Sequence, residues 1–128
     1  MGSELDRAVA LLGPLEGRIM RAVWTGQVPG VFVVRDVQAL MPELAYTTVM
    51  TTLRRLAAKG VLAARAEPGR KAHRYRAAAT PAGFLAAASA REAADVVDRY
   101  GEAALAAFAA RLADLTPEQR QRLGELQK

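Results

Sequence analysis

The chain has 128 residues, of which 52% are hydrophobic and 5% aromatic, and it carries a formal net charge of +5 at pH 7. This apolar fraction excludes global disorder, and the length fits one domain or one small domain with an appended association element. The absence of cysteine excludes structural disulfides, thiolate metal sites and cysteine nucleophiles. Because no stretch approaches the ~20 apolar residues of a membrane span, we expect a cytoplasmic protein that does not insert into a membrane.

The positive charge is concentrated in one part of the chain. Residues 1–80 hold twelve Lys and Arg against six Asp and Glu, whereas residues 81–128 hold six against seven. The stretch 54–76 alone has eight basic residues and one acid, Glu67. A basic patch confined to one section of a domain is typical of a polyanion-binding surface, although a solvated basic face would have the same composition.

Two helices and a short strand are predicted between residues 14 and 42. Apolar residues recur at helical spacing from Leu15 to Trp24, after Pro14 in a first-turn position and before Gly26. Trp24 lies on this apolar stripe and is expected to be a core residue. The β-branched run 31–34 follows a Pro-Gly turn and predicts a short strand. Residues 35–41 carry an apolar face and predict a two-turn helix, which a proline ends.

A longer helix and a hairpin follow. The clearest helix runs over residues 45–59, and Gly60 is of the residue type that ends helices. Residues 61–66 and 73–77 are extended segments on either side of a Pro-Gly turn, which predicts a β-hairpin. The order helix, strand, helix, helix, hairpin is that of a winged helix-turn-helix domain, in which the third helix enters the major groove of DNA and the hairpin is the wing.

The remaining chain is rich in alanine and predicts further helices. Thr80 and Pro81 open the first helix, Gly101 interrupts the pattern, and Thr116 opens the last helix. Alanine buries little area, so this half is expected to need a partner to complete its core. The fold class is therefore mostly α with a small β-hairpin. We predict a winged helix-turn-helix DNA-binding domain over residues 8–79 and a helical dimerisation region over residues 80–128.

The predicted recognition helix has two chemically different faces. Val49, Leu53, Leu56 and Ala57 recur at i, i+4, i+7 and i+8 and are expected to face the core. The opposite face is rich in threonine and arginine, although threonine is a mediocre helix former. Hydroxyls and guanidiniums suit contacts to base edges, and a threonine methyl can pack on a thymine methyl. The predicted base contacts are Thr47, Thr48, Thr51 and Arg54.

Other side chains nearby are candidates for contacts to the DNA backbone. Free amides and the dipole attract phosphate at the start of a helix, and a short hairpin tip can approach a phosphate or the minor groove. The predicted backbone contacts are Tyr46, Arg55, Arg70, Lys71 and His73. The alternatives are capping and back-bonding for the threonines, and an ordinary charged hairpin tip for the wing. With one histidine and no cysteine, neither a metal site nor a cofactor is predicted.

Three segments resemble the penicillinase-repressor family of winged-helix regulators, namely residues 12–24, 34–37 and 45–60. The wing segment 71–75 is also similar, with Lys71 where an arginine is usual. The resemblance implies a homodimeric transcriptional repressor on an inverted-repeat operator, often with TACA and TGTA half-sites, that controls β-lactam resistance or related stress genes. It also implies dimerisation through the C-terminal helices, where the apolar candidates are Leu85, Val96, Val97, Tyr100, Leu105, Phe108 and Leu112.

The same resemblance implies a partner that ends repression. In the family, a membrane sensor protease triggers cleavage of the dimerisation region before a phenylalanine. Phe108 matches that residue, so the candidate cleavage site lies between Ala107 and Phe108. Ala107 stands where the staphylococcal members have asparagine, and Val33 stands where a threonine usually caps the second helix. Related copper-responsive repressors carry a C-terminal CxC motif, which this chain lacks.

Two other classes of function compete with a sequence-specific repressor. An architectural, largely sequence-neutral DNA-binding protein could use the same basic hairpin. An enzyme is not predicted, because one histidine, no cysteine and no paired carboxylates on a predicted pocket wall leave no nucleophile and base to combine.

Overall fold

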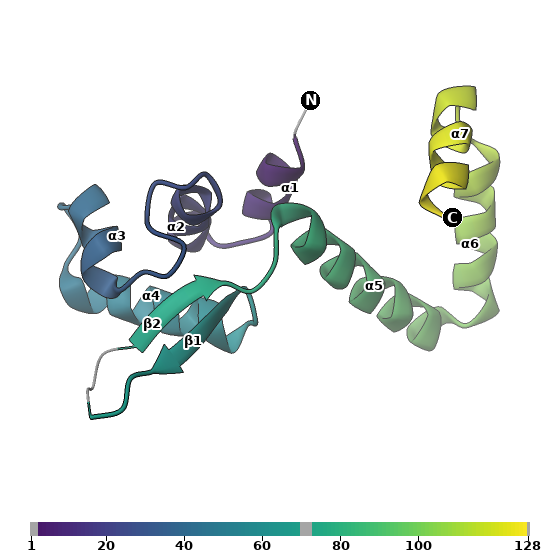
Figure 1. The fold of residues 1–128 in the computed structure, drawn as a ribbon. Coiled ribbons are helices and arrows are strands. Elements are labelled where there is room, and N and C mark those ends of the chain that lie inside the picture. The colour runs from purple at the N-terminus through teal and green to yellow at the C-terminus, as the bar shows by residue number, and fades with distance from the viewer. Residues whose placement is uncertain (1–2, 70–72, 128) are drawn as a thin grey trace. The chain divides into compact units, whose positions relative to one another are not determined.

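The structure is a computed structural model that describes residues 3–69 and 73–127. Within these ranges the chain forms seven helices and one two-stranded antiparallel sheet (Figure 1). The elements are, in chain order, α1 (Glu4–Ala10), α2 (Pro14–Trp24), α3 (Val34–Leu40), α4 (Tyr46–Ala58), β1 (Leu62–Ala66), β2 (His73–Ala77), α5 (Pro81–Tyr100), α6 (Glu102–Ala113) and α7 (Pro117–Leu126). The chain divides into two compact units, residues 1–87 and 88–128, and α5 begins in the first and continues into the second.

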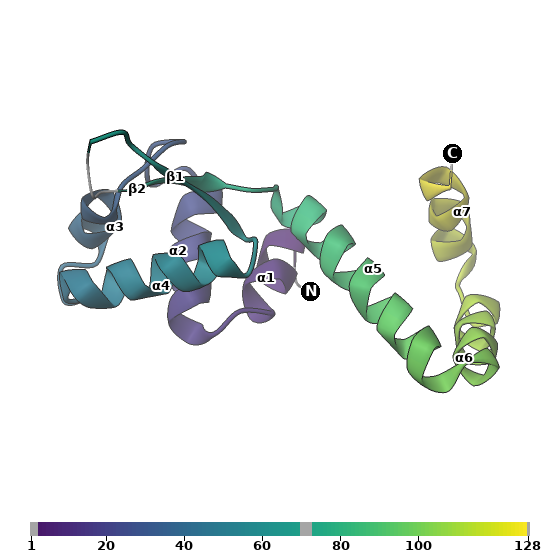
Figure 2. The same cartoon turned by 90° about the horizontal axis from the view of Figure 1, so that it is seen from below.

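The first unit is a winged helix-turn-helix fold, as the sequence predicts. α4 packs against α2, α3 and β1, and Figure 2 shows it running along the hairpin with α3 near its N-terminal end. The predicted core face of α4 is confirmed, because Val49, Leu53 and Leu56 are fully buried. The other elements complete one apolar core with the buried side chains Ile19, Met20, Phe32, Val37, Leu62 and Tyr75.

The transition from α4 to the hairpin depends on a glycine. Gly60 has φ +79°, a left-handed conformation that side chains with a Cβ rarely adopt, and the chain leaves the helix there. The amide of Val61 then donates to the carbonyl oxygen of Leu56 at 2.9 Å. β1 pairs with β2 in a register that runs from Leu62 opposite Ala77 to Ala66 opposite His73. The predicted end of the helix and the predicted hairpin are both confirmed.

The predicted strand over residues 31–34 is wrong. Phe32 forms only an isolated antiparallel bridge with Tyr75, with reciprocal backbone hydrogen bonds of 2.9 and 2.8 Å. Val34 already belongs to α3, because the Asp36 carboxylate accepts from the Val33 amide at 2.9 Å and begins the helix there. Asp36 thus satisfies one of the free amides at the start of α3, although Val33 has no side-chain oxygen of its own.

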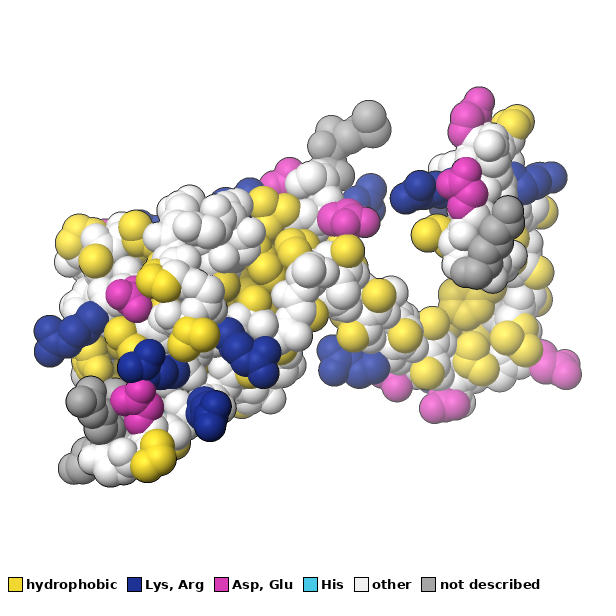
Figure 3. Space-filling model, viewed as in Figure 1, with side chains coloured by type: hydrophobic (Ala, Val, Ile, Leu, Met, Phe, Trp, Pro, Cys, Tyr) yellow, Lys and Arg dark blue, Asp and Glu magenta, His cyan; other side chains and the backbone are white. Residues whose placement is uncertain are grey.

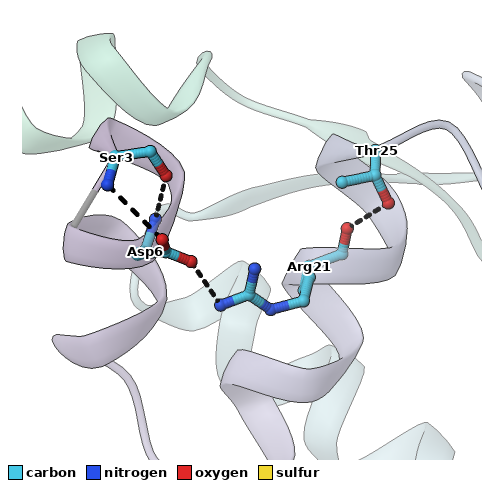
Figure 4. Close-up of polar contacts among 4 residues, drawn as sticks. All are labelled: Ser3, Asp6, Arg21 and Thr25. Carbon is cyan, nitrogen blue, oxygen red and sulfur yellow. Dashed lines mark hydrogen bonds and ion pairs between the residues drawn. The ribbon is translucent and has the colours of Figure 1, made fainter. Parts of the chain in front are cut away.

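The structure also has an N-terminal helix that was not among the predicted elements. Ser3 caps α1, since its hydroxyl accepts from the Asp6 amide at 3.1 Å. Asp6 also accepts from the Arg21 guanidinium of α2 at 2.9 Å, which ties the two helices together (Figure 4). A Cβ on Gly17 would lie 3.1 Å from the carbonyl oxygen of Val9, so the glycine permits the close approach of α1 to α2.

Trp24, the last residue of α2, contacts the segment after β2 and the first turn of α5. Its indole nitrogen donates to the carbonyl oxygen of Ala79 at 2.9 Å, and its ring lies 5.8 Å from that of Phe84 on α5. The side chain is partly buried against the core, as predicted for a core residue. These contacts hold the first turn of α5 within the first unit.

The second unit contains the rest of α5 with α6 and α7. Gly101, with φ +62°, separates α5 from α6, as the sequence predicts. Thr116 and Gln119 form reciprocal hydrogen bonds of 3.1 and 3.0 Å that cap α7. Among the described residues of this unit, Ala104 is the one buried hydrophobic residue. None of the helices in the described residues combines the length and the hydropathy that a membrane-spanning segment requires.

Candidate nucleic-acid interface

The face of α4 that points away from the core is exposed along its whole length. Its members are the predicted contacts Thr47, Thr48, Thr51, Arg54 and Arg55, together with Tyr46, whose exposed fraction is 41%. Ala45 precedes the helix and supplies no side-chain cap, so among the described residues no side chain satisfies the free amides of the first turn. The structure therefore brings these six predicted residues onto one surface with donors at its N-terminal end.

The fourth threonine of the helix has a different role. Thr52 is 5% exposed, and its hydroxyl donates to the carbonyl oxygen of Thr48 at 2.8 Å. Back-bonding, the alternative considered for all the threonines, therefore applies to Thr52. The hydroxyls of Thr47, Thr48 and Thr51 form no hydrogen bond with the described residues.

The opposite end of α4 is held by a half-buried ion pair. Lys59, the residue that ends the helix, donates to Oε1 of Glu16 at 2.7 Å, and the Gly13 amide donates to the same oxygen at 3.2 Å. The Lys59 hydrogen bond, joined by the bond from Gly13, holds the pKa of Glu16 below its ordinary value even though burial opposes this. One carboxylate thus connects the start of α2 to the end of α4.

A groove of about 560 Å³ lies beside the N-terminal half of α4. Its walls come from α3, α4, β2 and the segment after β1, and its basic lining residues are Arg35, Arg54, His73 and Arg74. Figure 3 shows Lys and Arg side chains over the region of α3 and the hairpin. Glu67 also lines the groove and forms an ion pair with Arg74.

The base of the wing is described, and its tip is not. His73 is half-buried at the start of β2, with its ring 6.3 Å from that of Tyr75. Burial raises the pKa of the Tyr75 hydroxyl, with an opposing effect from the nearby Arg54 charge. The predicted backbone contacts Arg70 and Lys71 lie outside the described residues.

A model of the family described as penicillinase repressor matches residues 12–128. The chain belongs to this family. It is therefore a DNA-binding regulator of the transcriptional repressor type and is not an enzyme.

Solved structures give weaker similarities. This penicillinase-repressor chain is similar to the crystal structure of Rv0081 from M. tuberculosis, with 26% sequence identity and a TM-score of 0.45. The match covers 75% of this chain and 89% of that chain. TrmBL2, described as an archaeal chromatin protein with a novel mode of DNA binding, is similar at 22% identity, with a TM-score of 0.49 over 90% of this chain and 45% of that chain. A comparison with curated proteins found no match.

The contacts predicted from the sequence of this repressor did not include Arg35 and Arg74, which line the groove. Arg74 belongs to the basic stretch 54–76, so its charge was visible, and the hairpin register places it on the groove. Arg35 stands 11 positions before Tyr46 in a different helix, and only the packing of α3 on α4 brings the two side chains together. No local pattern in the sequence indicates that contact.

The residues predicted for dimerisation and cleavage lie on α5 and α6. Leu85 is half-buried in the first unit, whereas Val96 and Val97 are half-buried in the second. The exposed fractions are 58% for Tyr100, 55% for Leu105, 40% for Phe108 and 49% for Leu112. Ala107 and Phe108 are both exposed and both helical, within α6.

Proposed function

We propose that this chain is a homodimeric repressor that recognises an inverted-repeat operator through the exposed face of α4. One observation carries the proposal. Val49, Thr52 and Leu53 are buried in the core, whereas the side chains of Thr51 and Arg54 on the opposite face form no hydrogen bond or ion pair with the described residues. Threonine contributes little to helix stability, so its repetition on an exposed face suits base contacts better than it suits folding.

The proposed base contacts are Thr47, Thr48, Thr51 and Arg54. The proposed backbone contacts are Tyr46, Arg55, Arg70, Lys71 and His73. The uncapped amides at the start of α4 support a phosphate near Tyr46, because free N–H groups and the helix dipole both favour an anion there. The proposed domain division is a DNA-binding domain over residues 8–79 and a dimerisation region over residues 80–128.

The exposed apolar side chains of α6 support the homodimer. Leu105, Phe108 and Leu112 recur at helical spacing and would lose water contact in an interface between two copies. A two-fold dimer presents two recognition helices to half-sites separated by about one helical turn of DNA, or a multiple of it. The proposed targets are genes of β-lactam resistance or a related stress response. The proposed location of the protein is the cytoplasm, where operator DNA is accessible.

Cleavage by a membrane sensor protease between Ala107 and Phe108 is the proposed release step. The bond lies inside α6, and proteases act on transiently opened backbone, so this helix would have to unwind locally before cleavage. Separation of the dimer would then weaken operator binding, because the two recognition helices would no longer be linked and each would bind its half-site independently.

The experiment measures affinity for a duplex with TACA and TGTA half-sites against a scrambled duplex at one salt concentration. A repressor should prefer the former by about 1,000-fold or more. Thr51→Val should reduce this preference, because it removes the exposed hydroxyl. Arg54→Ala should reduce it by about 1–3 kcal/mol if the guanidinium contacts a guanine. The matched control is Thr52→Val, which alters a buried threonine of the same helix and should leave the preference unchanged.

An equal affinity of the unaltered chain for both duplexes, followed by failure to enrich a common sequence from a random pool, would favour the architectural class of DNA-binding protein. A preference that survives both Thr51→Val and Arg54→Ala would move sequence recognition away from α4.

A further inference from the structure

Arg35 and Tyr46 meet at the edge of the groove beside α4. The guanidinium carbon of Arg35, in the first turn of α3, lies 6.0 Å from the centroid of the Tyr46 ring, in the first turn of α4. This separation is at the outer limit of a cation–π contact. Both side chains line the groove, and Arg54 lines it from the next turns of α4.

Apart from its contact with the Tyr46 ring, the guanidinium of Arg35 has no ion-pair partner among the described residues. Several other basic residues of the first unit are paired with acids across elements, namely Arg18 with Glu43, Arg21 with Asp6, and Lys59 with Glu16. Arg35 is exposed, and it has no carboxylate partner among the described residues. Its place near the start of a helix is also unfavourable for a cation, because the helix dipole favours cations at the other end.

Two arginines without an ion pair among the described residues line the groove. Arg35 and Arg54 approach it from two helices, and its acidic lining residue, Glu67, forms an ion pair with Arg74. The apolar side chains Val34 and Met50 also line it, and a low-dielectric wall strengthens the attraction between a guanidinium and an anion. The groove therefore suits a group with negative charge and several hydrogen-bond acceptors.

We propose that this groove binds a phosphate of the DNA backbone, with Arg35 as the contacting residue and the Tyr46 ring as its positioning residue. The inference rests on the proposed function, because Tyr46 and Arg54 border both the groove and the surface assigned to DNA. A planar guanidinium can donate two parallel hydrogen bonds to one phosphate, and the ring limits the directions in which Arg35 can point. Arg35 thus adds a contact from α3 to those of α4 and the wing.

The test measures DNA affinity as a function of salt for Arg35→Ala, using the TACA/TGTA duplex and a scrambled duplex of ~30 base pairs. Loss of one phosphate contact should lower the slope of log K against log salt by about one. At about 0.1 M salt this corresponds to a five- to tenfold loss of affinity, equal for the two duplexes. Arg35→Lys keeps the charge and should retain most of the slope.

The control is Arg7→Ala, which removes an exposed arginine from α1 that has no ion pair among the described residues. It changes the net charge by the same amount, so it should leave the slope nearly unchanged if the effect of Arg35 is local. Thermal unfolding of both variants checks that neither alters the fold.

The positioning role of Tyr46 is tested by a double-mutant cycle. Tyr46→Phe keeps the ring and should preserve the effect of Arg35→Ala, whereas in a Tyr46→Leu background that effect should shrink by at least about threefold. Additive losses in the Tyr46→Leu background would show that the ring does not position Arg35.

Three outcomes separate this inference from the proposed function. An unchanged salt slope in Arg35→Ala, with a loss of operator preference in Arg54→Ala, overturns the groove site and leaves the proposed function intact. A loss confined to the TACA/TGTA duplex also overturns it, because a phosphate contact is independent of sequence. If the unaltered chain shows no operator preference, the proposed function fails. The salt slope of Arg35→Ala on the scrambled duplex then still supports or overturns the phosphate contact, because that contact does not depend on sequence.

Discussion

At the scale of single residues, similar side chains differ in whether the fold already uses them. Thr51 and Thr52 are neighbours in α4, yet Thr52 is buried and bonded to the Thr48 carbonyl, and Thr51 is exposed. Glu16 and Glu43 both pair with basic residues, but the exposed fraction of the side chain is 10% for Glu16 and 52% for Glu43. Burial decides which of these contacts contributes to stability, because water screens the exposed ones.

Replacement of Glu16 by glutamine should lower the free energy of unfolding by about 1–2 kcal/mol near neutral pH, since Lys59 and the Gly13 amide would lose a charged acceptor. The pKa of Glu16 is lowered in the folded state. Its contribution is therefore complete above the unfolded value of about 4.3 and is lost as the pH falls through the lower, folded pKa. Denaturant unfolding from pH 7 to pH 3 measures this.

The Glu16→Gln deficit should accordingly be constant above about pH 5 and shrink below about pH 4. Glu43→Gln is the control, because its pair with Arg18 is exposed and screened by water, so its deficit should be much smaller than that of Glu16→Gln. A deficit that grows as the pH falls would show that the carboxylate is not stabilised in the folded state.

At the scale of elements, the helices differ in how their N-termini are capped. Ser3 caps α1 and Thr116 caps α7, while Asp36 reaches back to the Val33 amide at the start of α3. Before α4 stands Ala45, which cannot accept a hydrogen bond through its side chain. Val33 and Ala45 both lack a side-chain cap of their own, but only α3 of these two has an acidic side chain that accepts from an amide at its start. Among the described residues no side chain accepts from the first amides of α4, which leaves them able to donate to an anion.

Ala45→Ser should therefore raise the free energy of unfolding by about 0.5–1 kcal/mol, because a hydroxyl at this position accepts from a first-turn amide. Ala45→Asp should stabilise the helix similarly and yet weaken DNA binding, since its carboxylate would occupy the amides and repel phosphate. Chemical denaturation and a binding titration on the same samples measure both effects. Equal DNA affinity for Ala45→Asp and Ala45→Ser would argue against a phosphate at the start of α4.

At the scale of the whole molecule, the two units differ in how much they bury. The first unit has a continuous core from α2, α3, α4 and the hairpin. In the described part of the second unit, Ala104 is buried while Leu105, Phe108 and Leu112 remain exposed. Alanine-rich helices have too little side-chain volume to close a core of their own, which is why the sequence predicts an association element here.

Phe108→Glu should convert the proposed dimer to a monomer in sedimentation velocity and weaken operator binding by about 100-fold or more, because the two half-sites would be bound independently. The control is Ala103→Glu, an exposed position on the opposite side of α6 by helical spacing, which should leave the dimer intact. Circular dichroism checks that both variants keep their helices. A dimer that persists in Phe108→Glu would place the interface elsewhere.

Local patterns in the sequence were sufficient to predict the helices with strong periodicity, the hairpin, the glycine at the end of α4 and the buried face of that helix. These features depend on neighbours within a few positions, where spacing and residue type are sufficient. The early start of α3 is also local, because Asp36 accepts from the Val33 amide three positions before it, and the sequence-based prediction overlooked this pair. Tertiary structure decided that Phe32 makes one bridge, because its partner Tyr75 lies in a distant part of the chain. It also placed Arg35 beside Tyr46, because contacts between helices depend on packing that no local pattern records.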